Sequence, residues 1–398
     1  MSIWLALLVI LLAFYVMTEI VDRHFIKSLD NIAEWMNLPP SVAGATLLAL
    51  GTSAPEISTA LFALFLKDTS PATGVGTIVG SAIFQILVVI GFAAVVKTSY
   101  LNWRPVMRDS IFYAFSVGLL ILFVADNKFT LIEGITFVSS YFLYLFILYL
   151  WTKYVNEDGP RKSSSTGFDL PNGSARVQFE GAQNHFDTPR PIEAIEKNME
   201  GETARNPFKI LQKSLGYPVE FIMNLIPDPE EKPKWTIPVF VLSLVIIAGA
   251  SYFLVIAAES LASAVGIDKA IIALTILAGG SSIPEMISSA IVAKQGRGDM
   301  AIANAIGSNI FDILMSLGLP VLIYIIAKGE PLDGLGGANI NSSIILLFTT
   351  LIVVVLLLFL QKFKASRPFG LFLIFLYVIY VIAAYMGWID GGTNPVTP

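Results

Sequence analysis

Gly51-Thr-Ser-Ala-Pro-Glu56 and Gly280-Ser-Ser-Ile-Pro-Glu285 are two similar stretches, and each lies within an apolar run long enough to cross a bilayer. A carboxylate at that depth is energetically costly, so an acidic residue there indicates a functional site. Neither run contains a Lys or Arg that could neutralise the acid. The partner is therefore expected to be a proton or a bound cation.

The composition around these stretches is that of a multi-span membrane protein. Of the 398 residues, 55% are hydrophobic and 14% are charged, and the mean hydropathy is +0.72. These values lie outside the range of soluble chains. The net charge of -5 gives no support for nucleic-acid binding. The absence of cysteine excludes disulfides and thiolate metal sites.

Apolar windows of about 20 residues, the length of one crossing, predict an all-α membrane protein with ten transmembrane helices. The segment from Ile3 to Ile20 has no basic residue before it, so it is interpreted as a retained first span rather than a secretory signal. The windows cover roughly residues 3–22, 41–66, 72–96, 108–125, 130–152, 236–261, 270–293, 300–327, 342–361 and 368–388.

The spans predict two membrane domains of five helices each, roughly residues 1–155 and 235–390, with a short tail at 391–398. Residues 156–234 form a polar central loop, interpreted as a partly flexible tether rather than a regulatory ion-binding element. Short loops on the side of this loop hold ten bases, including Arg23 and Lys27, against four on the other side. The positive-inside rule then predicts a multi-pass plasma-membrane (cell inner membrane) protein with a cytoplasmic central loop and both termini extracytoplasmic.

The two halves of the chain repeat. The opening stretches lie 229 residues apart and share their glycine, proline and glutamate, and Gly80-Ser-Ala-Ile-Phe-Gln85 matches Gly307-Ser-Asn-Ile-Phe-Asp312 with a shift of 227. Five spans per half is an odd number, so the second copy enters the membrane from the opposite side. This predicts two inverted five-helix repeats with a substrate site near the membrane midplane.

The repeated stretches supply clusters of hard oxygen atoms. Pro55 and Pro284 each free a backbone carbonyl four residues earlier, and hydroxyl groups lie three or four residues from each acid, on the same helix face. Two such clusters facing each other provide the roughly six to eight oxygen ligands that Ca²⁺ prefers, and Na⁺ can use smaller sets. The hydroxyl residues are Thr52, Ser53, Ser281 and Ser282.

The second block adds polar side chains from both halves. Ser81 and Gln85 are four residues apart, as are Ser308 and Asp312, so each pair can lie on one helix face. Asn309 is a further candidate. Gly76, Gly80 and Gly307 are expected to allow close helix approach, although packing alone explains any single Gly or Ser here. Glu19, Glu133 and Glu259 lie near span ends and carry less weight as transport residues.

These blocks resemble those of the cation/Ca²⁺ exchanger superfamily, most closely the potassium-dependent sodium/calcium exchangers. The likeness extends over most of the chain except the central loop. The stretches that carry it are Leu50–Glu56, Gly74–Phe84, Leu274–Ala278, Gly280–Glu285, Gly298–Ala301 and Gly307–Asp312.

The resemblance implies an antiporter that exports Ca²⁺ against inward Na⁺ by alternating access. It implies that Glu56 and Glu285 are the central Ca²⁺ ligands, that Ser81 and Ser308 line flanking Na⁺ positions, and that Asp312 is the acid associated with potassium dependence. The remaining implied ligands are the hydroxyl groups of Thr52, Ser53, Ser281 and Ser282 and the backbone carbonyls of Ala49 and Ala278.

Two positions depart from the family pattern. Gln85 stands where the family usually has Asn, which lengthens one flanking site by a methylene group. Glu285 stands where the potassium-dependent members usually have Asp. Coupling to K⁺ is therefore left open.

Other functions remain as alternatives. A Ca²⁺/H⁺ exchanger would use the same fold, but the hydroxyl groups beside each acid favour Na⁺. A cation channel could also use acids and carbonyl groups. A serine hydrolase would need a base beside a serine, and the two histidines, His24 and His185, lie outside the predicted spans. The expected protein is thus not an enzyme, has no cofactor, and has Ca²⁺, Na⁺, open K⁺ coupling and the lipid bilayer as its partners.

Overall fold

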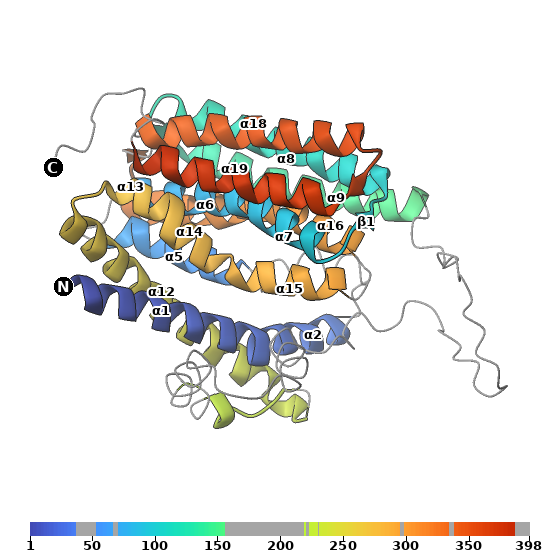
Figure 1. Ribbon diagram of the computed structural model, residues 1–398. Coiled ribbons are helices and arrows are strands. Elements are labelled where there is room, and N and C mark those ends of the chain that lie inside the picture. Colours follow the sequence, from blue (N-terminus) through green and yellow to red (C-terminus); the bar gives the residue numbers. More distant parts are fainter. Residues whose placement is uncertain are drawn as a thin grey trace, which may run out of the picture.

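The computed structural model describes residues 1–36, 53–66, 71–155, 219, 223–229, 231–294, 298–333 and 338–386. The predicted central loop from residue 156 to 218 and the tail after residue 386 lie outside them. In the view of Figure 1, α1 and α12 run along one side of a helical bundle and α18 and α19 along the other, with α5, α6 and α14 between them.

The first half of the chain consists of helices with two short strands. Its described elements are α1 (Ile3–Ile20), the π-helical segment η1 (Val21–Phe25), α2 (Ile26–Trp35), α5 (Ala54–Phe65), α6 (Pro71–Phe84), the π-helical segment η3 (Gln85–Val89), α7 (Ile90–Val96), β1 (Ser99–Tyr100), α8 (Trp103–Val124), β2 (Lys128–Phe129) and α9 (Leu131–Val155).

The second half follows a similar order. Its described elements are the 3₁₀ turn η4 (Pro233–Trp235), α12 (Thr236–Val265), α13 (Lys269–Ile272), the π-helical segment η5 (Ala273–Leu277), α14 (Ala278–Ser281), α15 (Ile283–Lys294), α16 (Gly298–Phe311), the π-helical segment η6 (Asp312–Leu317), α17 (Gly318–Lys328), β3 (Leu332–Asp333), α18 (Ala338–Leu360), β4 (Lys364–Ala365) and α19 (Arg367–Tyr385).

Eight helices in the described residues are long and apolar enough to cross a membrane. Two of the ten predicted spans are not among them. Residues 41–66 are described only from Ser53, and the helical run through residues 270–293 is interrupted at Ser282. The eight are Ile3–Leu29, Pro71–Val96, Trp103–Val124, Leu131–Trp151, Pro233–Val265, Ala301–Lys328, Ile340–Leu360 and Arg367–Tyr385.

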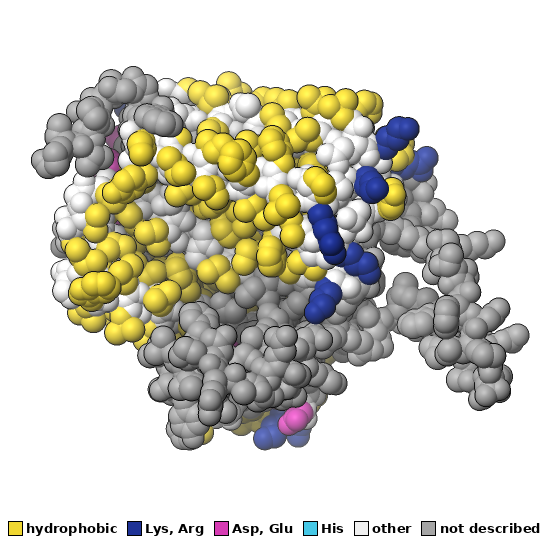
Figure 2. All heavy atoms as spheres, viewed as in Figure 1, with side chains coloured by type: hydrophobic (Ala, Val, Ile, Leu, Met, Phe, Trp, Pro, Cys, Tyr) yellow, Lys and Arg dark blue, Asp and Glu magenta, His cyan; other side chains and the backbone are white. Residues whose placement is uncertain are grey.

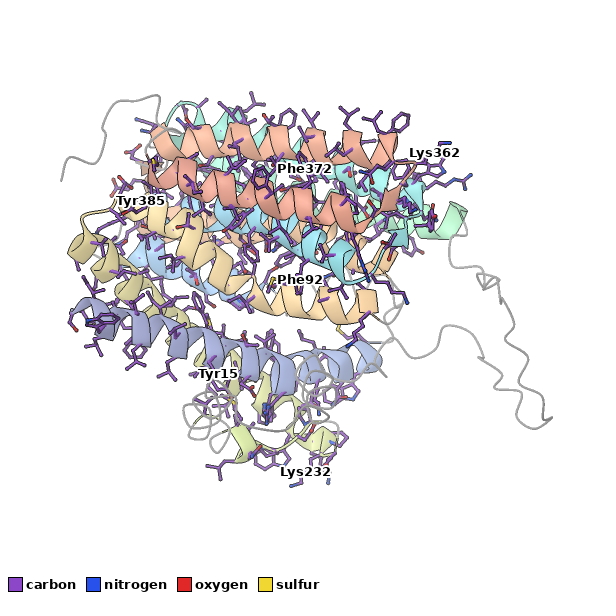
Figure 3. All side chains as sticks on the ribbon, in the orientation of Figure 1. Tyr15, Phe92, Lys232, Lys362, Phe372 and Tyr385 are labelled. Carbon is purple, nitrogen blue, oxygen red and sulfur yellow. The ribbon has the colours of Figure 1, made fainter. Side chains whose placement is uncertain are left out.

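The outer surface of the bundle is apolar. Figure 2 shows hydrophobic side chains over most of the described surface on this side, with Lys and Arg gathered towards one end. Phe92, Phe372 and Tyr385 are exposed, and Lys362 lies at the end of the bundle (Figure 3). Exposed apolar side chains around long apolar helices are typical of a lipid-facing surface. The protein is therefore an integral multi-pass membrane protein.

The first helix extends further than the hydropathy window predicts. Arg23 lies in η1 and Lys27 in α2, so the prediction that both are loop residues is wrong. Each base has an acidic partner, Glu19 for Arg23 and Asp228 for Lys27, the latter with Nζ to Oδ2 at 2.5 Å. These pairs let the helix continue past its apolar part.

The described elements of the two halves correspond closely. α5 and α15 both contain 12 residues, and α6 and α16 both contain 14. A π-helical segment follows α6 and α16, beginning at Gln85 and Asp312. Such widened turns are frequent at functional sites. The duplication in the sequence is therefore also a duplication of local structure.

Two small antiparallel strand pairs join the halves. β1 pairs with β4, with Ser99 opposite Ala365, and β2 pairs with β3, with Phe129 opposite Leu332. α8 separates β1 from β2 along the chain. Each pair thus takes one strand from each half.

α6 forms the centre of the core. Every side chain from Thr73 to Phe84 is buried. At Gly80 a Cβ atom would lie 2.2 Å from the carbonyl oxygen of Leu274 and 2.7 Å from the Cβ of Ala278. Glycine is therefore required for this close approach of α6 to η5 and α14, and the prediction for Gly80 is confirmed. For Gly307 it stays a prediction, because residues 37–52, the counterpart region, lie outside the described residues.

Candidate cation-binding site

The two glutamates lie in the first turns of matching helices. Glu56 is in the first turn of α5 and Glu285 in that of α15. The residue before each helix has nearly the same backbone conformation, with φ -93° and ψ 7° at Ser53 and φ -94° and ψ 7° at Ser282. A helix N-terminus carries partial positive charge and favours a carboxylate in its first turn. The break in each half thus positions one acid in the same way.

Both glutamates are buried, and within the described part of the chain nothing satisfies the geometry of a hydrogen bond to their carboxylates. Glu56 is 0% and Glu285 2% exposed, and none of their four carboxylate oxygens has a hydrogen-bond partner among the described residues. Glu56 also lies close enough to Glu285 and Asp312 for their negative charges to repel. Buried carboxylates without partners are strongly unfavourable unless a cation or a proton compensates them.

Acids alone do not form a complete metal site in this region. Within the described ranges, no three Asp, Glu, His or Cys side chains are grouped so that they could hold a metal ion by themselves. Any ion bound beside the glutamates must therefore also use hydroxyl, carboxamide or backbone oxygens. Such mixed oxygen sets are what Ca²⁺ and Na⁺ accept.

A hydrogen-bonded layer from both halves lies next to the glutamates. Ser81 and Ser282 share a hydrogen bond of 2.6 Å between their Oγ atoms. Gln85 donates from Nε2 to Oδ2 of Asp312 at 3.0 Å and accepts at Oε1 from Ser308 at 2.8 Å. All five side chains are buried. The structure therefore brings these predicted site residues from the two halves into direct contact.

Ser53 and Ser281 lie beside the acids. Ser53 is next to the carboxylate of Asp312, and Ser281 is next to that of Glu56. The hydroxyl of Ser281 donates to the carbonyl of Ala278 at 3.2 Å, and this carbonyl also accepts the backbone N–H of Ser282 at 3.3 Å. The Ala278 carbonyl already accepts two hydrogen bonds, so its role as an ion ligand stays a prediction.

Three other predicted residues complete the account. Asn309 donates to the carbonyl of Ala305 at 2.8 Å, and its buried Oδ1 has no partner in the described part of the chain. Its role as an ion ligand stays a prediction. Ala49 and Thr52 lie outside the described residues.

The spacing analysis missed several polar residues near the site. The buried hydroxyls of Thr59 and Ser289, three and four residues after the glutamates, have no partner among the residues described. Ser316 donates to Oδ1 of Asp312 at 3.2 Å. Helical spacing of three or four residues could have identified these three. Tyr113 of α8 is buried near Asp312, and no local pattern pointed to it.

The other three acids each have a protein partner. Glu19 pairs with Arg23, and Glu133 caps its own helix by accepting the backbone N–H of Thr130 at 2.6 Å. Glu259 pairs with Lys269 and accepts from Thr73 at 3.1 Å. These contacts explain the acids as structural residues and separate them from Glu56 and Glu285.

Curated relatives extend over nearly the whole chain. Sodium/potassium/calcium exchanger 2 of Homo sapiens is 27% identical, covering 94% of this chain and 76% of the relative. The exchanger of the same name from Gallus gallus is 29% identical, covering 92% and 75%. Sodium/potassium/calcium exchanger 4 of Mus musculus is 25% identical, covering 94% and 79%.

Two solved structures have a similar fold. The H⁺/Ca²⁺ exchanger CAX aligns with a TM-score of 0.63 at 14% identity, covering 97% of this chain and 85% of that one. The sodium-calcium exchanger NCX_Mj aligns with a TM-score of 0.53 at 22% identity, covering 96% and 99%. The family described as "Sodium/calcium exchanger protein" matches residues 6–150 and 235–386, about three quarters of the chain. With both membrane halves matched, the chain belongs to the sodium/calcium exchanger protein family.

Proposed function

We propose that this protein is a secondary active antiporter that exchanges Na⁺ for Ca²⁺ across the membrane by alternating access. The observation that carries the proposal is the pair of buried glutamates, Glu56 and Glu285, whose carboxylate oxygens have no partner among the described residues. Two carboxylates balance the charge of one Ca²⁺, and the surrounding oxygens are hard ligands. The names of the curated relatives include both exchanged ions, sodium and calcium.

The proposed architecture is ten transmembrane helices arranged as two inverted five-helix repeats. The strand pairs support it. β1 and β3 are equivalent strands, because each follows the third predicted span of its half. They nevertheless belong to different strand pairs, and the long helix α8 separates the two pairs along the chain. Equivalent strands at opposite ends of a long helix are expected when one copy is inverted. The excess of bases in the loops on the side of the central loop further supports a cytoplasmic central loop with both termini extracytoplasmic.

The proposed ligand set combines both halves. Glu56 and Glu285 bind Ca²⁺ at the centre, and hydroxyl groups beside them complete the Ca²⁺ and Na⁺ sites. Na⁺ binding at the flanking positions competes with Ca²⁺ for the shared carboxylates, which couples the two ions. The further ligands are Ser53, Ser81, Ser281, Ser282 and Ser308, with Thr52 and the carbonyls of Ala49 and Ala278.

Charge-neutralising variants test the assignment. In Na⁺-loaded liposomes containing the purified protein, uptake of radiolabelled Ca²⁺ should fall about tenfold or more for Glu56→Gln and for Glu285→Gln, because each removes a charged ligand. Glu330→Gln is the matched control, since Glu330 is exposed and far from the break motifs in sequence. Near-normal uptake by either site variant would overturn the ligand assignment.

The driving ion separates this function from its alternatives. An outward Na⁺ gradient should drive uptake, and removing that gradient should stop it. Uptake driven by a pH gradient without Na⁺ would identify a Ca²⁺/H⁺ exchanger. In such an exchanger, protons instead of Na⁺ would neutralise the two buried carboxylates. Uptake that follows the Ca²⁺ gradient alone would identify a channel.

A further inference from the structure

The three buried acids of the site fall into two classes. Both oxygens of Asp312 accept hydrogen bonds, Oδ2 from Gln85 at 3.0 Å and Oδ1 from Ser316 at 3.2 Å. Around Glu56 and Glu285 no described donor has the geometry of a hydrogen bond, although the Ser281 hydroxyl lies beside Glu56. Each donor takes up one of the lone-pair positions at which a carboxylate oxygen can bind a cation, so the donors on Asp312 compete with ion coordination.

Gln85 is fixed at both ends of its carboxamide. Its Nε2 contacts Asp312 at 3.0 Å and Ser81 at 3.4 Å, and its Oε1 accepts from Ser308 at 2.8 Å. The reverse orientation would place the amide oxygen against the Asp312 carboxylate, where neither group can donate. The NH₂ end of the Gln85 carboxamide must therefore point towards Asp312.

The length of Gln85 is what allows this contact. Gln85 begins η3 in the first half and Asp312 begins η6 in the second, so the side chain bridges the two halves. Asn is shorter by one methylene group, about 1.5 Å of reach. With Asn at this position, the 3.0 Å contact to Asp312 would lengthen beyond hydrogen-bonding range.

Resting on the proposed function, we propose that Gln85 is a specificity-determining residue that keeps Asp312 out of the ion-binding set, so that no alkali cation, K⁺ or Na⁺, binds at Asp312. Gln85 occupies Asp312 with an amide N–H in the position that a monovalent cation would take. Removing that donor leaves a buried carboxylate without its amide contact, and it then gains affinity for such a cation.

Three variants test this inference by transport: Gln85→Asn, Asp312→Asn and the double variant. The measured quantity is the ratio of Na⁺-driven Ca²⁺ uptake with K⁺ to uptake with choline. This ratio should stay near one for the wild type and Asp312→Asn, change severalfold for Gln85→Asn, and return towards one in the double variant. If Asp312→Asn changes this ratio by the same factor in the wild type and in Gln85→Asn, the inference is refuted.

A binding measurement keeps the test independent of exchange activity. Thermal unfolding of the purified full-length protein is compared in K⁺, Na⁺ and choline at equal ionic strength. At ten times its Kd, a newly bound cation raises the folded-to-unfolded ratio about tenfold. K⁺ or Na⁺ should therefore raise the melting temperature of Gln85→Asn more than that of the wild type or the double variant.

Gln85→Met provides a second variant with similar length and no amide, and the same gain is expected from it if Gln85→Asn folds poorly. Equal cation responses of these variants and the wild type would refute the inference even if the protein transports Ca²⁺ with Na⁺. Conversely, a gain in cation response without Na⁺-driven uptake would leave the role of Gln85 intact and reject the proposed exchange.

Discussion

Gly80→Ala is the most direct test of the helix packing that holds the site together. An added Cβ would lie 2.2 Å from the carbonyl oxygen of Leu274 and 2.7 Å from the Cβ of Ala278. The first contact is to backbone and the second to a side chain without rotamers, so no side-chain rotation can relieve either. α6 must move away from η5 and α14.

The required movement is about 1 Å, because a non-bonded carbon and oxygen approach to about 3.3 Å at the closest. Overpacking of this kind costs about 1–3 kcal/mol, which exceeds the gain of up to about 1 kcal/mol from replacing Gly by Ala inside a helix. The same movement would stretch the 2.6 Å hydrogen bond between Ser81 and Ser282 past its useful range. Stability and transport should therefore both decrease.

Gly118→Ala is the matched control. Gly118 lies inside α8, and a Cβ there would meet no atom of the described residues within 4 Å. Thermal unfolding of the purified proteins should give a lower melting temperature for Gly80→Ala and an equal or higher one for Gly118→Ala. Uptake of radiolabelled Ca²⁺ should fall only for Gly80→Ala. Equal melting temperatures and equal transport for the two variants would contradict the close approach of α6 to η5 and α14 at Gly80.

Two further predictions concern ion pairs outside the site. Lys27→Ala and Asp228→Ala each leave a mostly buried charge, so each should lower the free energy of unfolding by about 1–3 kcal/mol. The double variant should lose less than the sum of the two single losses. Additive losses in thermal unfolding would contradict a direct pair. Glu259→Gln keeps an acceptor for Thr73 but loses the ion pair with Lys269, so Na⁺-driven uptake should stay within about twofold of wild type. A loss as large as that of Glu56→Gln would place Glu259 in the transport path.

Hydropathy predicted most of the helices because lipid-facing and buried positions are both apolar. The window at residues 72–96 agrees with the helical run Pro71–Val96. The window at 108–125 begins late, since the helix starts at Trp103 with Asn102 as its cap. Charged residues in a first turn lower the hydropathy of a window without ending the helix.

Local spacing predicted which two acids are buried at the centre of the candidate site. The glycine, proline and glutamate pattern identified Glu56 and Glu285, and both are buried in the first turns of their helices. Contacts between the halves could not be predicted in this way. The hydrogen bond from Gln85 to Asp312 joins residues 227 positions apart, and its existence depends on how η3 packs against α16 and η6 against α6.

The pairing of the four short strands has a consequence for the origin of the site. β1 of the first half is equivalent to β3 of the second, and β2 is equivalent to β4. Exchanging the two halves therefore turns the β1–β4 pair into the β3–β2 pair, which is the other observed pair. A contact that reproduces itself when the partners are swapped is typical of a symmetric dimer. The two strand pairs thus have the pairing that a symmetric dimer would show. Identical subunits would carry the same residue at equivalent positions, so placing an amide, Gln85, opposite a carboxylate, Asp312, requires two halves whose sequences differ.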